Sequence, residues 1–181
     1  MRYIIFFLIL FYPSNVFASS TEQIKNKLKE TNNMSFKFIQ KIGKKTEQGE
    51  CIISYPKKIF CKYDDIYNKV LVSNGKSLVI KTISSYYIYP LKETPLELIL
   101  DKKYLIDIIS KSKNYHVDEN FVAFKFFKNE SEVNIFFDKK TLNLMGWQTV
   151  DLYQNLNIVF LSSMSFNQKI KKKTFVLPQS D

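Results

Sequence analysis

The sequence predicts a mainly β protein with a few short helices, and three observations support this fold class. Phe, Tyr and Ile are frequent, whereas alanine occurs only at Ala18 and Ala123, a composition that favours strands over helices. Apolar and polar residues alternate with period two along most of the chain, as they do in half-buried strands. Short turn signals separate these stretches, so neighbouring strands are expected to pair antiparallel. The 181 residues suit one domain with its own core.

The first eighteen residues have the pattern of a secretory signal peptide. Arg2 supplies a positive start, residues 3–12 form an uncharged apolar run, and residues 16–18 offer a cleavage site after Ala18. The run is shorter than the roughly 20 apolar residues that span a bilayer. A buried N-terminal strand or an uncleaved anchor is the alternative. We expect a signal peptide over 1–18 and one exported domain over 19–181, which has no arginine and a net charge of +9 instead of +10.

The exported domain is expected to begin with a helix and to continue with six strands. Ile24 and Leu28 lie four residues apart, which predicts a short amphipathic helix over residues 20–31. The pattern then changes to period two, and Asn74-Gly75 is a strong signal for a two-residue hairpin turn. The predicted strands of this antiparallel meander cover residues 34–40, 49–55, 59–63, 70–73, 77–83 and 86–90.

Short apolar helices are expected to interrupt the strands over residues 94–111. Thr94 is predicted to be the N-cap, with Pro95 at the first helical position and Glu97 three residues after the cap. Five further strands are expected over residues 115–118, 121–128, 132–138, 143–151 and 156–166. The prediction is therefore about eleven strands and two or three helices.

The two cysteines are candidates for a disulfide bond. A hairpin centred near Pro56 places Cys51 opposite Cys61 on one face of the two strands. An exported protein reaches an oxidising compartment, where paired thiols tend to be bridged. The alternative is a pair of small apolar side chains that face the interior.

No pattern in the sequence predicts catalysis or metal binding. The single histidine, His116, and the two cysteines lack metal-ligand spacing, and the 4 glycines form no phosphate-binding loop. Asp64-Asp65 and Asp118-Glu119 are expected to be solvated turn residues, and a hydrolase with carboxylates assembled in space is the alternative. Positive charge and aromatic strands would suit nucleic acid, but an export signal and dispersed lysines oppose this. We expect no enzyme activity, cofactor, metal or nucleic-acid partner.

The order of several motifs resembles the outer-membrane lipoprotein carrier family, LolA, over nearly the whole mature chain. The motifs are FKFIQ at 36–40, GECIISYPKKIFCKY at 49–63, LVSNGK at 71–76, PLKETPLELIL at 90–100, LMGW at 144–147 followed by Asp151, and FVLP at 175–178. The resemblance implies an open, curved antiparallel half-barrel that is covered by a lid of helices.

The resemblance also implies a function and partners. It implies a monomeric periplasmic carrier without a cofactor, which accepts acylated lipoproteins from an inner-membrane ABC transporter and shields their acyl chains. It then delivers them to an outer-membrane lipoprotein receptor. Two alternatives stay open, namely a periplasmic half-barrel that binds or senses another lipid, and a structural module of the envelope with a filled core and no ligand.

The expected site is an apolar cavity, because moving an acyl chain into water costs about 0.8 kcal/mol per CH₂. The alternation of apolar and polar residues by itself predicts only that the apolar faces of the strands are buried in an ordinary core. The resemblance to the carrier family implies that these faces form the wall of a cavity. The expected wall residues are Phe36, Phe38, Ile53, Tyr55, Ile59, Cys61 and Tyr63. The expected lid residues are Leu91, Leu96, Ile99 and Leu100.

One position departs from the family that the sequence resembles. The family commonly has an arginine at the position of Tyr55 or in the strand after the proline, where several donors can hold carbonyls of the lid. Tyr55 offers one hydroxyl, and Lys57 and Lys58 each offer an ammonium without the planar fork of a guanidinium. We expect Tyr55 to be the latch and the lid to be held more weakly than an arginine would hold it.

Overall fold

The computed structural model describes residues 20–180 apart from 114, 129–130 and 151–154, so the predicted signal peptide lies outside the described residues. Eleven strands form one antiparallel sheet that stays open, which confirms the predicted fold class. The strands are β1 (Asn33–Ile42), β2 (Lys45–Ser54), β3 (Lys58–Tyr63), β4 (Val70–Asn74), β5 (Ser77–Lys81), β6 (Tyr86–Pro90), β7 (Tyr115–Val117), β8 (Phe121–Lys128), β9 (Ser131–Asp138), β10 (Leu144–Val150) and β11 (Leu156–Phe166).

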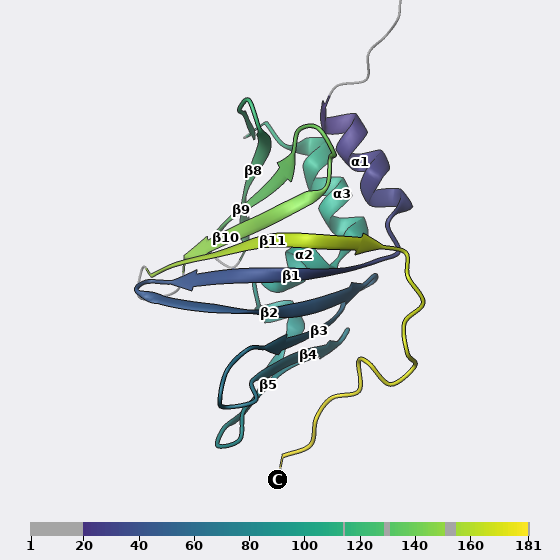
Figure 1. Ribbon diagram of the computed structural model, residues 1–181. Coiled ribbons are helices and arrows are strands. Elements are labelled where there is room, and N and C mark those ends of the chain that lie inside the picture. Colours follow the sequence, from purple (N-terminus) through teal and green to yellow (C-terminus); the bar gives the residue numbers. More distant parts are fainter. Residues whose placement is uncertain (1–19, 114, 129–130, 151–154, 181) are drawn as a thin grey trace, which may run out of the picture.

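The sheet consists of two meanders that share one central pair of strands. Strands β1 to β6 extend to one side in chain order, β11 back to β7 extend to the other, and β1 pairs with β11 between them. The free edges are therefore β6 and β7. Figure 1 shows the two arms curving away from the long central strands, which leaves a concave face.

The helices all cover this concave face (Figure 1). They are α1 (Ser20–Glu30), the 3₁₀ turn η1 (Leu91–Glu93), α2 (Leu96–Leu100) and α3 (Lys102–Lys111). The helices predicted over 20–31 and within 94–111 are confirmed. The predicted cap of the second helix is wrong, because the Thr94 hydroxyl donates to the carbonyl of Leu91 at 2.8 Å and closes η1 instead.

The core lies between the helices and the concave face. Residues that alternate along the strands point inward, and the largest fully buried side chains are Ile24, Met34, Ile53, Ile59, Leu91, Leu98, Ile99, Leu100, Leu105, Ile109, Phe124 and Phe137. Gly49 of β2 allows the backbone of β3 to approach closely, because a Cβ atom there would collide with Lys62 and Tyr63. The rings of Phe38 and Tyr63 meet edge to face from the strands on either side of Gly49, with centroids 5.0 Å apart.

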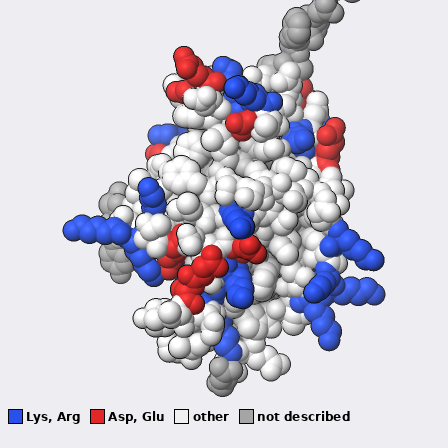
Figure 2. Space-filling view, in the orientation of Figure 1, with Lys and Arg blue, Asp and Glu red and all other residues white. Residues whose placement is uncertain are grey.

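Charged residues are distributed over the outside of the molecule. On the face drawn in Figure 2, basic side chains gather at the lower right, acidic and basic side chains adjoin one another at the left of centre, and uncharged surface lies between these groups. The C-terminal segment after β11 runs along the outer face, where Ile170 and Val176 flank a groove whose floor includes Ile52 and Phe60. No helix among the described residues is long and apolar enough to cross a membrane.

Candidate functional site: an apolar cavity beneath a lid

A cavity of about 330 Å³ opens in the concave face beneath η1 and α2. We call residues 91–100, which form these two short helices, the lid. The floor of the cavity comes from β1 to β5 and from β10 and β11, and the cover comes from Thr94, Pro95, Leu96 and Ile99 of the lid. The cavity therefore spans the junction of the two meanders, where β1 pairs with β11.

Six of the wall and lid residues expected from the sequence line this cavity. They are Phe38, Ile59, Cys61 and Tyr63 on the strands, and Leu96 and Ile99 on the lid. The strand residues share a face because side chains alternate along each strand and pair across β1, β2 and β3. The lid residues cover them from the other side.

Four other expected residues lie in the core beside the cavity. Phe36 and Ile53 have the same phase as the wall residues but are buried farther along β1 and β2. Leu91 and Leu100 of the lid are buried at 1% and 0% exposure. These side chains support the wall and the lid, and the cavity lining does not include them.

The two cysteines are joined by a disulfide bond in the structure. Cys51 pairs directly with Cys61 across β2 and β3, in the register that a hairpin near Pro56 predicts, and the Cα atoms are 4.1 Å apart. Both residues line the cavity, so the bridge is part of its wall.

Sequence reasoning missed about two thirds of the lining. The missed residues are Gln40, Ile42, Lys69, Leu71, Leu78, Ile80, Thr94, Pro95, Trp147, Thr149, Asn157 and Val159. Period two along β1 places Gln40 and Ile42 on the same face as Phe38, so continuing the alternation would have found them. The contribution of β10 and β11 depends on the pairing of β1 with β11, which no local pattern indicates.

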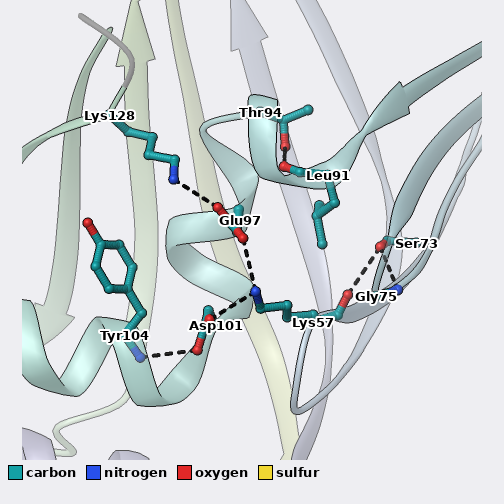
Figure 3. Close-up of polar contacts among 9 residues, drawn as sticks. All are labelled: Lys57, Ser73, Gly75, Leu91, Thr94, Glu97, Asp101, Tyr104 and Lys128. Carbon is teal, nitrogen blue, oxygen red and sulfur yellow. Dashed lines mark hydrogen bonds and ion pairs between the residues drawn. The ribbon is translucent and has the colours of Figure 1, made fainter.

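The lid is held to both arms of the sheet through one carboxylate. Figure 3 shows Glu97 of α2 between two lysines. Lys57, in the turn between β2 and β3, places its Nζ 3.0 Å from Glu97 Oε1, and Lys128 at the end of β8 places its Nζ 2.8 Å from Glu97 Oε2. Lys57 also pairs with Asp101 Oδ2 at 3.1 Å, and its backbone N–H donates to the carbonyl of Leu100 at 2.9 Å.

The charges of this latch stabilise one another. Burial opposes the ionised form of Glu97, but hydrogen bonds from Lys128 and Lys57 outweigh it and hold the pKa of Glu97 below its ordinary value. Hydrogen bonds to Glu97 and Asp101 raise the pKa of Lys57. Glu97 and Lys57 are therefore both charged at neutral pH. The side chains of Glu97, Lys128 and Lys57 are 12%, 21% and 33% exposed, so water screens the ion pairs only in part.

Tyr55 does not have the latch role expected of it. Strand β2 ends at Ser54, so Tyr55 lies in the turn, packs against the edge of the core and does not line the cavity. Its hydroxyl is buried and makes no hydrogen bond to any described residue, and burial raises its pKa. Lys57, two residues later, and Lys128 contact the lid instead, through their ion pairs with Glu97.

The arrangement is suited to binding an apolar ligand. The lining is dominated by aliphatic and aromatic side chains, and no cluster of metal-ligating side chains occurs among the residues that the structure describes. The model of the family described as "Outer membrane lipoprotein carrier protein LolA" matches residues 29–178. The chain belongs to the LolA family. Proteins of this family are carriers, and the cavity beneath the lid lies within the matched residues.

Solved structures with a similar fold are distant in sequence. An uncharacterised conserved protein from Thermus thermophilus has a TM-score of 0.50 at 6% identity, covering 88% of this chain and 95% of that chain. A putative outer membrane lipoprotein-sorting protein domain from Vibrio parahaemolyticus has a TM-score of 0.48 at 9% identity, with 86% and 94% covered. A LolA superfamily protein from Nitrosomonas europaea has a TM-score of 0.44 at 7% identity, with 88% and 99% covered. Comparison with curated proteins gives no match.

Proposed function

We propose that the protein is a periplasmic carrier of acylated lipoproteins. In this proposal it accepts them from an inner-membrane ABC transporter, shields their acyl chains in the cavity and delivers them to an outer-membrane receptor. The observation that carries the proposal is an apolar cavity beneath a pair of short helices, in a chain of the LolA family.

The energetics of acyl chains explain why such a carrier needs both a cavity and a movable lid. Exposing a chain of about sixteen carbons to water costs on the order of 10 kcal/mol, at about 0.8 kcal/mol per CH₂. The cavity of about 330 Å³ is at the lower end of the roughly 300–1,000 Å³ that ligand pockets occupy. We therefore expect the lid to move away from the sheet when cargo enters.

Release of lipoproteins from membranes tests the proposal. Protein purified from the periplasm is added to spheroplasts that synthesise labelled lipoproteins, and the soluble fraction is assayed for label. We expect soluble lipoprotein in complex with the carrier. Absence of both release and binding of an apolar fluorescent probe would contradict the proposal.

A pair of isoleucine variants assigns the activity to the cavity. Ile80 lines the cavity and is only partly buried, so Ile80→Glu places a charge in the wall while the deep core stays intact. Ile39 lies on the outer face of β1 and is 44% exposed, so Ile39→Glu is the matched control. We expect Ile80→Glu to abolish release and Ile39→Glu to retain it, with both variants folded by circular dichroism.

A further inference from the structure

The cavity has a polar end. Along β1 the inward residues Phe36 and Phe38 are followed by Gln40, and along β10 Trp147 is followed by Thr149. On β11 the inward residue before Val159 is Asn157. Because β1, β11 and β10 are neighbours, Gln40, Asn157 and Thr149 all lie toward the end of the sheet where β1 turns into β2. Ile42, which pairs with Asn157, is the apolar residue among them.

These polar groups form a connected chain across the strands. The Tyr63 hydroxyl donates to Gln40 Oε1 at 3.0 Å, and Gln40 Nε2 donates to Asn157 Oδ1 at 3.0 Å. Among the described residues, no acceptor pairs with Asn157 Nδ2 and none with the hydroxyl of Thr149. Amide N–H groups thus remain available at the cavity surface, next to otherwise apolar walls.

The one cation that lines this end, among the described residues, already has an ion-pair partner. Lys69 lines the cavity, and its Nζ lies 3.9 Å from the centroid of the Tyr63 ring and 2.7 Å from Glu47 Oε2. Burial opposes the charged form of Glu47, but hydrogen bonds from Lys45 and Lys69 hold its pKa below its ordinary value. The carboxylate therefore keeps Lys69 paired, and the ammonium of Lys69 is held by Glu47 and against the Tyr63 ring instead of extending toward a ligand.

We propose that this polar end binds the uncharged ester or amide carbonyls that join acyl chains to the head of the cargo lipid. Carbonyl oxygens accept hydrogen bonds from the amides of Gln40 and Asn157, and the hydrocarbon chain extends from there beneath Leu96 and Ile99 of the lid. A few placed polar groups in an apolar pocket fix the orientation of a ligand in this way. The inference rests on the proposed function, since it specifies how the same cavity orients its ligand.

A double substitution tests the inference. Gln40→Leu with Asn157→Leu is made in Tyr63→Phe protein, so that the Tyr63 hydroxyl is not left without its acceptor. The whole chain of polar groups is then replaced by apolar groups, and the fold is expected to tolerate this. Gln48→Leu with Gln148→Leu makes the same chemical change on the outer face and serves as the matched control. Binding of 1-monolauroylglycerol, laurate and the apolar probe N-phenyl-1-naphthylamine is measured for each protein by fluorescence displacement or calorimetry.

We expect the wild type to bind monolauroylglycerol more tightly than laurate. The inner double variant is expected to lose about ten-fold in affinity for monolauroylglycerol while binding the apolar probe as before. The outer double variant is expected to match the wild type for every ligand. Three outcomes would overturn the proposed orientation of the ligand while leaving the carrier proposal standing. The inner double variant could lose affinity equally for the probe and for monolauroylglycerol, it could lose affinity for neither, or the wild type could bind laurate more tightly than monolauroylglycerol. A wild type that binds no ligand at all would overturn both.

Discussion

Lys57 and Lys128 lie on opposite arms of the open sheet, yet they bind the two oxygens of the same carboxylate, that of Glu97, at 3.0 and 2.8 Å. The lid thus connects two arms of the sheet that are not neighbours: within the part of the chain that the structure describes, no strand of one outer arm pairs with a strand of the other except through β1 and β11. The ion pairs of Glu97 therefore bridge the open side of the half-barrel, where no backbone hydrogen bonds join the described strands. We infer that opening the lid requires breaking these ion pairs together with the backbone hydrogen bonds at its two ends, from Leu91 to Lys76 and from Lys57 to Leu100.

The latch predicts that removing Lys57 loosens the lid without unfolding the sheet. Lys57→Met removes the pairs to Glu97 and Asp101 but leaves the backbone hydrogen bond to Leu100. Partly exposed ion pairs contribute about 1 kcal/mol, so amide hydrogen exchange of α2 should become about five-fold faster. The neighbouring Lys58→Met is the control, because Lys58 is exposed and makes no ion pair with a described residue. Equal exchange in the two variants would contradict the latch.

A second substitution separates Tyr55 from the latch. Because the Tyr55 hydroxyl is buried without a hydrogen-bond partner among the described residues, Tyr55→Phe removes an unsatisfied group and should leave the stability unchanged or slightly raised, by up to about 1 kcal/mol. Exchange of the lid amides should stay as in the wild type. Faster lid exchange in Tyr55→Phe would show that the hydroxyl holds the lid after all.

The pH dependence of the lid follows from the shifted pKa values. The lysines lower the pKa of Glu97 from 4.5, so its ion pairs are fully present above that pH and are lost as pH falls through the lowered value. The pKa of Lys57 is raised from 10.5, so its contribution is present below that pH and is lost as pH rises through the raised value. Protection factors of the α2 amides should therefore be constant from about pH 5 to pH 9 and fall only in acid, as pH drops through the lowered pKa of Glu97. A transition near neutral pH would contradict this assignment.

The Cys51–Cys61 bridge is expected to stabilise the cavity wall. It closes a loop with a sequence separation of 10, for which the loss of chain entropy in the unfolded state corresponds to about 2–3 kcal/mol. The double variant Cys51→Ala with Cys61→Ala should lower the free energy of unfolding by that amount in denaturant titrations. Reductant should destabilise the wild type equally and leave the variant unaffected. A wild type that is insensitive to reductant would contradict the prediction.

Much of the fold was predictable because local signals agree with one another. Alternation along residues 36–40 and 59–63, with the Asn74-Gly75 turn between later strands, determined the face and direction of the first meander. Alternation gives a wrong prediction of side-chain position where a strand ends earlier than the pattern does. Tyr55 continues the period of Ile53, but β2 stops at Ser54, so the ring leaves the wall and enters the turn.

The latch and the polar end depend on contacts that the sequence does not display. Lys57 and Glu97 are separated by 40 residues, and nothing local distinguishes Lys57 from the adjacent Lys58. Gln40 and Asn157 are 117 residues apart and meet because β1 pairs with β11. Alternation along β1 places Gln40 on the inner face, but the sequence does not show that β11 pairs with β1 and brings the amide of Asn157 beside it.

The account rests on acyl chains entering the cavity beneath the lid, and site-specific photo-crosslinking tests this most directly. The photoreactive residue p-benzoylphenylalanine replaces Leu71, which lines the cavity, or Ile39, which is exposed on the outer face. Cells are grown with an alkyne-labelled fatty acid, and crosslinked acyl groups are detected on the purified protein. We predict labelled lipoprotein crosslinked at position 71 and not at position 39. Absence of acyl label at position 71, or equal labelling at both positions, would contradict the account.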